Sequence, residues 1–493
     1  MRGAVVRQRT QKEAGAYYTP DAVVRTLLEW VVRYPDDRLI DPACGDGRFI
    51  AGHRNTVGIE QDNLAVRLAR MRAPWALVHE GDFFTWAARV TERFECAAGN
   101  PPFIRYQHFT GETRARALDL CTRLGANFTR LTSSWAPFLA AVAGVLKPGG
   151  RLAFVVPAEI GHAPYAAPLL EYLVQRFALV HVVAVREKFF PSLSEDCWLL
   201  YTEGFSGRTE QIRFTVQERF VPSTTPPSQF IQISVAEWRG IWNRRLRPFL
   251  LDPDARKLYR DIAVLPTARR FGDLVTVGIG YVSGANEFFH LRPSEAHKFD
   301  IPHQFLHPTV RNGRALTSSR LTQAIVDGWK RDDNPILLLK IPKMAELPHQ
   351  VRRYLELDCA QAARRAYKCR MRDPWYSVPD VQVPDFFLTY MSGLQPVLVR
   401  NDAGCTCTNS VHAVRIKNSP EARDHLRSWG SDFVRLSCEI EGHPLGGGLL
   451  KMEPREAAQI VFPPPSVAKE LSPTLLSEAI GTMRLWRHYD SST

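Results

Sequence analysis

The chain has 493 residues, long enough for two or three domains with sizeable cores. Hydrophobic residues make up 45% of it and charged residues 23%, which is ordinary for a globular protein, and no apolar run reaches membrane-spanning length. Lys and Arg outnumber Asp and Glu by 63 to 51, and this net charge of +12 indicates a polyanionic partner, most simply nucleic acid.

The N-terminal segment and the cysteines indicate the cellular compartment in which we expect the protein. The stretch from Met1 to Ala14 is polar and charged and has no apolar signal core, so we expect a cytoplasmic protein without membrane contact. The nine cysteines are scattered and form no CxxC pair, which predicts reduced thiols. No Cys/His cluster predicts a metal site.

The first 205 or so residues alternate between predicted strands and predicted helices. This alternation is typical of a mostly parallel α/β sheet with helices on both faces, whose ligands lie at the carboxyl ends of the strands. The predicted strands are 38–40, 56–59, 75–79, 94–98, 151–156, 180–185 and 197–201, and the main predicted helices are 22–32, 63–71 and 134–145.

The alternation ends near residue 220. Residues 221–228 are rich in Pro, Ser and Thr, and we predict a linker over 221–240. The remainder is irregular and rich in Pro, aromatic and basic residues. The predicted division is therefore a first domain over 1–220, a linker, and a second domain of mixed α+β structure over 241–493.

A Gly-rich turn, Asp41-Pro42-Ala43-Cys44-Gly45-Asp46-Gly47, follows the first predicted strand. Gly45 and Gly47 allow a ligand to approach the backbone, but the turn lacks the lysine of a phosphate loop. Further acidic residues follow the next two strands, although each alone is more often a solvated helix cap. Together they favour S-adenosylmethionine over a nucleotide, and the predicted cofactor set is Asp41, Ala43, Gly45, Gly47, Glu60 (for the ribose hydroxyls), Asp82 (for the adenine amino group) and Phe83 (over the adenine ring).

The sequence Asn100-Pro101-Pro102-Phe103 follows the apolar strand 94–98. An amino group on a planar ring is a poor nucleophile because its lone pair is delocalised. The Asn100 side-chain oxygen and the Pro101 carbonyl are two acceptors that favour a tetrahedral nitrogen, the prolines fix the backbone, and Phe103 offers a face for stacking. An isolated Asn-Pro-Pro is more often a rigid turn, but its position after the Gly-rich turn favours methyl transfer to such an amine.

This ordered set resembles the gamma-type adenine-N6 DNA methyltransferases, which are class I S-adenosylmethionine-dependent enzymes related to the Taq methyltransferase. Their cofactor motifs come first, the Asn-Pro-Pro-aromatic motif next and the target-recognition domain last. The segment Gly15-Ala16-Tyr17-Tyr18-Thr19-Pro20 is similar to the family's opening segment, which implies that Tyr18 and Thr19 lie by the cofactor. Phe189-Phe190-Pro191 resembles the motif that contacts the flipped base, a role that falls to Phe190.

The resemblance implies a Rossmann-like fold with a mostly parallel seven-stranded sheet over 1–220 and a DNA target-recognition domain over 241–493. It also implies methyl transfer to the N6 atom of an adenine extruded from double-stranded DNA. The chain departs from the family at Phe103, where Tyr is commoner. Because stacking needs only the ring, we expect activity to survive.

A basic run in the second domain is the predicted DNA contact. Its residues are interleaved with Tyr367, and a solvated helix face is an equally good interpretation. The predicted DNA-binding residues are Arg364, Arg365, Lys368, Arg370 and Arg372.

Two other functions compete with DNA methylation. The Asn-Pro-Pro-aromatic motif also serves methylation of RNA bases or of a protein glutamine amide, but those enzymes are usually shorter. A DNA-binding subunit with a vestigial methyltransferase fold is disfavoured because Asn100, Asp41 and Glu60 are intact. No fused nuclease motif is recognisable, so we expect a monomeric modification enzyme of a restriction or phage-defence system, served by a separate endonuclease.

Overall fold

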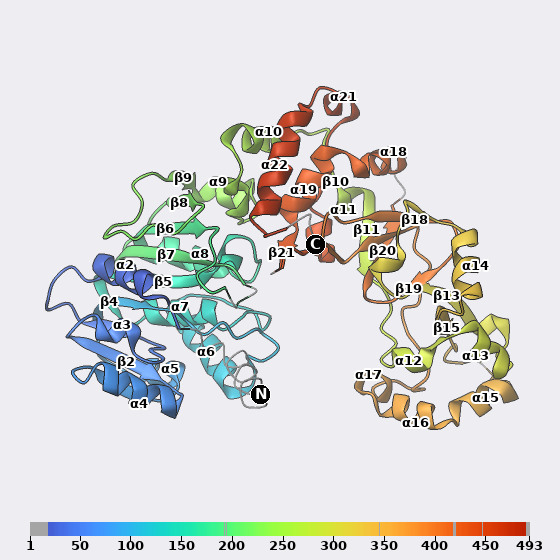
Figure 1. Cartoon of the computed structure of the whole chain (residues 1–493), viewed down its shortest axis with the longest axis horizontal. Helices are drawn as coiled ribbons and strands as arrows, with labels where there is room; N and C mark the ends of the chain where they lie inside the picture. The colour runs from blue at the N-terminus through green and yellow to red at the C-terminus, as the bar shows by residue number, and fades with distance from the viewer. Residues whose placement is uncertain are drawn as a thin grey trace. The chain divides into compact units, whose positions relative to one another are not determined.

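The computed structural model describes residues 18–191, 193, 195–344, 346–417, 421–445 and 447–489. Contacts between residues divide the chain into a first unit, Met1–Pro253, and a second unit, Asp254–Thr493 (Figure 1).

The first unit is built on a nine-stranded sheet in the order β3-β2-β1-β4-β5-β7-β6-β8-β9. Strands β3, β2, β1, β4 and β5 are parallel to one another, whereas β7 is antiparallel to both β5 and β6. The strands are β1 (Leu39–Asp41), β2 (Thr56–Glu60), β3 (Leu77–Glu80), β4 (Phe94–Gly99), β5 (Leu146–Pro157), β6 (Phe177–Val185), β7 (Cys197–Phe205), β8 (Gln211–Gln217) and β9 (Ile231–Ser234).

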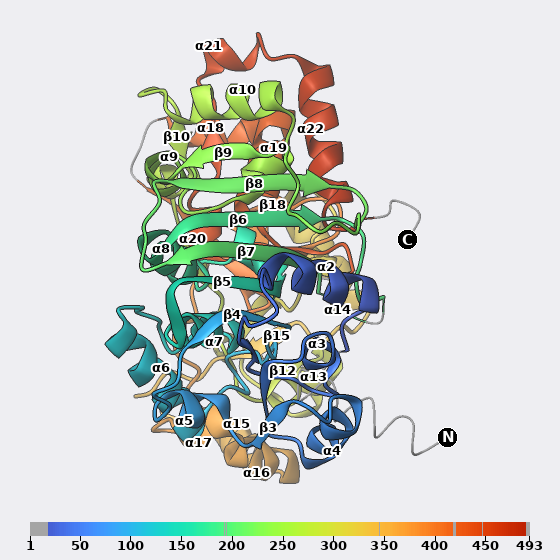
Figure 2. The ribbon, with the colours of Figure 1, turned by 90° about the vertical axis from the view of Figure 1, so that its left-hand side faces the viewer.

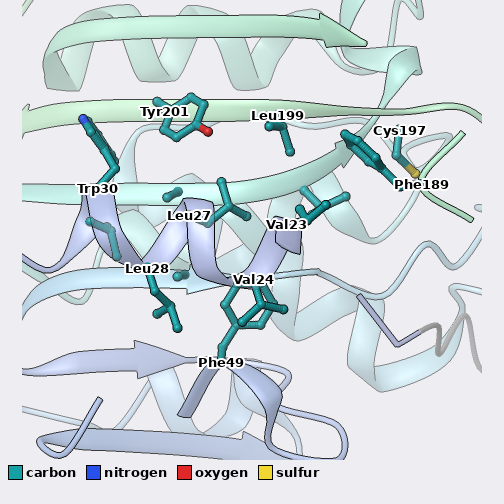
Figure 3. Close-up of a cluster of buried hydrophobic side chains, with 14 of the residues drawn as sticks. Val23, Val24, Leu27, Leu28, Trp30, Phe49, Phe189, Cys197, Leu199 and Tyr201 are labelled. Atoms are coloured by element: carbon teal, nitrogen blue, oxygen red, sulfur yellow. The ribbon is translucent and has the colours of Figure 1, made fainter. Parts of the chain in front are cut away.

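Helices cover both faces of this sheet (Figure 2). Helix α2 (Asp21–Val31) packs its apolar stripe on one face, where Trp30 meets Tyr201 edge to face at 5.1 Å between ring centroids (Figure 3). On the other face, α7 (Trp135–Ala143) is buried along its whole length because it lies between the sheet and α6 (Gly111–Leu124). The other helices include α3 (Arg48–Ala51), α4 (Asn63–Arg72), α5 (Phe83–Ala87), α8 (Ala167–Arg176) and α9 (Val235–Gly240).

The segment predicted to be a linker, 221–240, contains regular structure of the first unit. Strand β9 pairs antiparallel with β8, and α9 follows it directly. Together β8 and β9 extend the predicted seven-stranded sheet to nine strands. Their pairing was not visible in the sequence because a long, Pro-rich connection separates them.

The second unit carries several smaller sheets. The larger two have the orders β11-β20-β16-β18-β14 and β12-β15-β13-β19, and the smaller two are β17-β22-β21 and β10-β23. Its strands are β10 (Arg269–Arg270), β11 (Val275–Ile279), β12 (His290–Leu291), β13 (Leu306–Val310), β14 (Arg320–Leu321), β15 (Leu337–Leu339), β16 (Phe386–Thr389), β17 (Met391–Ser392), β18 (Leu398–Asn401), β19 (Thr406–Cys407), β20 (Val411–Ile416), β21 (His443–Pro444), β22 (Leu450–Lys451) and β23 (Val461–Phe462).

Helices surround these sheets, and apolar side chains form separate core clusters rather than one continuous core. The longer helices are α10 (Pro253–Ala263), α14 (Gln323–Arg331), α15 (His349–Leu355), α16 (Asp358–Arg365), α18 (Ala422–Arg427), α19 (Asp432–Glu441) and α22 (Pro473–Leu485).

Candidate active site

The carboxyl ends of β1 and β4 bring the two predicted loops together. Asp41 is the last residue of β1, and Gly99 is the last residue of β4, directly before Asn100. A Cβ atom added to Gly99 would lie 2.7 Å from the Asp41 carboxylate oxygen Oδ1. Glycine at position 99 therefore lets the Gly-rich loop and the Asn-Pro-Pro loop touch.

Acidic side chains accept hydrogen bonds from the backbone of the Gly-rich loop and fix its conformation. Gly47 has a φ of +87°, and a Cβ atom there would lie 2.8 Å from the Cα atom of Ala69 in α4, so only glycine fits. The Gly45 N–H donates to Glu60 Oε2 at 3.0 Å, and the Ala43 N–H donates to Asp41 Oδ1 at 3.2 Å. These bonds fix the loop at the edge of the sheet where a nucleoside would approach the backbone.

The three acidic residues of the predicted cofactor set differ in their burial and in the hydrogen bonds that they accept within the protein. Asp41 is 1% exposed, and this burial, reinforced by the nearby Glu60 and Asp46 carboxylates, raises its pKa to about 8. Glu60 already accepts backbone hydrogen bonds on both oxygens. Asp82 caps α5, but only Oδ1 is used, and within the described chain Oδ2 accepts no hydrogen bond.

The opening segment lies over the Gly-rich loop. A Cβ atom at Gly45 would meet Tyr18 at 3.8 Å, and Thr19 is buried. Arg48, at the start of α3, joins the two segments: its guanidinium stacks on the Tyr18 ring at 5.6 Å and donates to the Thr19 carbonyl and to Asp21. Residues 15–17 of the predicted opening motif lie outside the described residues. Sequence reasoning missed Arg48, since it fills an ordinary first-turn position of a short helix.

Phe83, predicted to cover the adenine ring of the cofactor, is 4% exposed and belongs to an aromatic group. Its ring centroid lies 4.8 Å from that of Phe138 in α7 and 6.0 Å from that of Phe84. Phe83 therefore belongs to a buried group of aromatic rings directly beside Asp82.

The Asn-Pro-Pro-Phe loop leaves the sheet at the end of β4. The Asn100 side chain is half-buried with its oxygen Oδ1 fully covered, and Pro101 is buried. Phe103 is half-buried and packs against a cluster that contains Phe189, Phe190 and Leu193. The structure thus brings Phe103 and Phe190, which are 87 positions apart in the sequence, to one apolar cluster; the neighbouring Phe189 and Cys197 are visible in Figure 3.

In the second unit, the predicted DNA-binding residues divide into two groups. Four of them are exposed, lie on or next to α16 and α17 (Tyr367–Arg370), and form no ion pair within the described residues. These four, named here the basic platform, are Arg364, Arg365, Lys368 and Arg370.

Arg372 has different surroundings from the basic platform. Its guanidinium is half-buried and donates to the carbonyls of Ser283 at 2.7 Å and Val282 at 2.5 Å, and burial lowers its pKa. It ties the chain after α17 to the loop after β11 instead of presenting its charge to solvent.

None of the helices in the described part of the chain combines the length and the apolar character that a membrane span requires. No three His, Cys, Asp or Glu side chains in the described ranges converge on a possible metal site.

Two family models match consecutive parts of the chain. The N-6 DNA Methylase model matches residues 5–214, and the model of the C-terminal domain of the type II methyltransferase M.Eco57I matches residues 243–488. Residues 5–214, somewhat less than half of the chain, thus match the N-6 DNA methylases. The chain is an adenine-specific DNA methyltransferase of a restriction–modification system, and S-adenosylmethionine is its methyl donor.

Individual relatives agree with this assignment. The chain is 23% identical to the type II methyltransferase M.XamI of Xanthomonas campestris pv. amaranthicola, over 91% of this chain and 85% of that protein. It is 28% identical to the type II methyltransferase M.TthHB8I of Thermus thermophilus over 30% of this chain and 35% of that one. In fold it is similar to the type IIL restriction–modification enzyme MmeI, with a TM-score of 0.51, 13% identity and coverage of 94% and 71%. The predicted Rossmann-like fold and gamma-type resemblance are thus confirmed.

Proposed function

We propose that this methyltransferase modifies one adenine of a specific duplex DNA site, using Asn100 and its loop as the catalytic element. The observation that carries the proposal is the contact of Gly99 with Asp41, since it puts the predicted acceptor for the amino group beside the predicted cofactor loop.

The residues present fit S-adenosylmethionine. The Gly45–Gly47 cradle admits a nucleoside to the backbone, and the carboxylates of Asp41, Glu60 and Asp82 favour a ligand with cationic groups and hydroxyls. When bound, the cofactor supplies the methyl group. In this proposal Glu60 and Asp82 bind its nucleoside part, Phe83 lines the adenine side, and Tyr18 and Thr19 cover the loop.

The Asn-Pro-Pro-Phe loop would hold the extruded adenine. Asn100 Oδ1 and the Pro101 carbonyl accept the two N6 hydrogens, which localises the lone pair on the nitrogen. Pro102 stiffens the loop, Phe103 stacks on the base, and Phe190 borders it from the same apolar cluster. These apolar walls also exclude water, so the acceptors act in a low-dielectric site.

The second unit would bind the DNA. The basic platform offers four exposed cations without ion-pair partners among the described residues, together with the exposed Tyr367 ring. A separate cognate endonuclease is the proposed partner in the cell, and a monomer is the proposed state of the enzyme.

Expression in a methylation-free host, followed by single-molecule sequencing of the host genome, tests the proposal. The wild-type chain should leave N6-methyladenine at one recurring motif, and Asn100→Ala should leave the genome unmodified. An unmodified genome in both cases would reject DNA as the substrate and direct the search to RNA bases or a protein amide.

A further inference from the structure

The hydroxyl of Ser134 is bound in an unusual way for its position. Ser134 precedes α7 and occupies the N-cap, where a serine normally accepts a hydrogen bond from the first turn of its own helix. Here the side chain makes no capping bond. Ser134 as a whole is only 2% exposed, so its hydroxyl must form its hydrogen bonds within the protein.

The partners of Ser134 are the two residues on either side of Phe103. Its hydroxyl donates to the Pro102 carbonyl at 2.5 Å and accepts the Ile104 N–H at 3.0 Å, while its own backbone N–H donates to the Ile104 carbonyl at 2.9 Å. Three hydrogen bonds from one residue therefore fix the backbone immediately before and after Phe103.

We propose that Ser134 is a positioning residue for methyl transfer: by clamping Pro102 and Ile104 to the start of α7, it sets the orientation of Phe103 and of the Asn100–Pro101 acceptors. This inference rests on the proposed function of that loop. The Pro101 carbonyl and the Phe103 ring can act on a base only if they are aligned before the base enters the site. A misplacement of about 1 Å costs roughly 100-fold in rate.

Helix α7 gives the clamp a rigid base. The helix is buried along its length, and its Phe138 ring packs on Phe83 beside the proposed cofactor site. The same helix therefore supports the catalytic loop through Ser134 and the cofactor wall through Phe138.

The neighbouring residue provides a matched control. Ser133 is also buried, at 7% exposed, but its hydroxyl is directed toward Tyr165, and among the described residues it makes no hydrogen bond to the loop. Ser133→Ala thus removes a buried hydroxyl one position away without touching the clamp.

The test compares Ser134→Ala, Ser134→Thr and Ser133→Ala in the full chain, using a duplex that carries the recognised motif. We expect Ser134→Ala to lower kcat about 10- to 100-fold, with the KM for DNA and the Kd for S-adenosylmethionine within about twofold of wild type. Ser134→Thr, which keeps a hydroxyl, should recover most of the rate, and Ser133→Ala should retain it. Equal losses in the two alanine variants, or an unchanged kcat in Ser134→Ala, would overturn the proposal.

Amide hydrogen exchange tests the hydrogen bond between Ile104 and Ser134 without any substrate. The Ile104 amide should exchange faster in Ser134→Ala than in wild type or Ser133→Ala, because its acceptor is gone. An unchanged Ile104 exchange rate would overturn the proposal even in a chain that proves inactive on DNA. An absence of methylation by the wild-type enzyme would instead count against the proposed function.

Discussion

Replacing Asp41 with Asn should stabilise the cofactor-free protein at alkaline pH and at the same time weaken its binding of S-adenosylmethionine. Burial raises the pKa of Asp41 from 3.8 to about 8. The folded protein therefore holds this proton more tightly than the unfolded chain does. The contribution of Asp41 to the free energy of unfolding should therefore fall by about 1.4 kcal/mol per pH unit between about pH 4 and pH 8, and stay level above that range.

The size of the effect follows from these limits. From pH 6 to pH 8 the wild-type protein should lose about 2–3 kcal/mol through this group, which for a unit of this size is roughly 5–10 °C in Tm. Asn has the shape of Asp and keeps an oxygen for the Ala43 N–H, but it has no charge to bury. The stability of Asp41→Asn should therefore exceed that of wild type by a margin that grows with pH.

The assay is thermal unfolding of both proteins without cofactor at pH 6, 7 and 8, beside calorimetric titration with S-adenosylmethionine. Asp402→Asn is the control, since Asp402 forms ion pairs with Arg320 and Arg400, is not among the groups that shift the pKa of Asp41, and its loss should give no gain in stability. Identical pH dependence of Tm in wild type and Asp41→Asn would refute the reasoning, as would undiminished cofactor affinity in the variant.

Three further changes have expected outcomes. Gly99→Ala should cost about 1–3 kcal/mol of stability and impair both cofactor binding and kcat, because the new Cβ atom meets Asp41; calorimetry and steady-state rates check this against Gly481→Ala, where a Cβ atom meets nothing within 4 Å. Phe103→Tyr should stay within about threefold of wild-type kcat/KM, whereas Phe103→Ala should lose about 10- to 100-fold, the worth of one stacked base; equal rates for both variants would exclude stacking. Changing all four residues of the basic platform to Ala should reduce the slope of log DNA affinity against log salt concentration by up to about four released counterions. Arg372→Ala should lower Tm and leave this slope unchanged, and it therefore tests whether the platform alone contacts phosphate.

The sequence predicted those parts of the site that depend on chemistry local to a strand end. Asp41, Glu60 and Asn100 were placed correctly at the carboxyl ends of their strands, because parallel pairing brings such ends to one edge whatever the loops do. The approach of Gly99, directly before Asn100, to Asp41 required only this rule.

Contacts between distant, non-periodic segments could not be predicted. Ser134 bonds to residues about thirty positions earlier, and Arg372 to carbonyls about ninety positions earlier. Both residue types occur commonly on surfaces, and no hydrophobic period marks a side chain that binds backbone. The same holds for β9, whose pairing with β8 depends on the path of a Pro-rich connection.

In the proposed function, the Asn100 loop directs a methyl group to adenine N6. The most direct test of this proposal is incubation of purified protein with duplex DNA carrying the motif and with cofactor labelled in the methyl group, followed by mass spectrometry of the nucleosides. Labelled N6-methyl-2′-deoxyadenosine should form with wild type and not with Asn100→Ala, although the variant still binds the cofactor. Label in cytosine, or equal labelling of adenine by both proteins, would contradict the account.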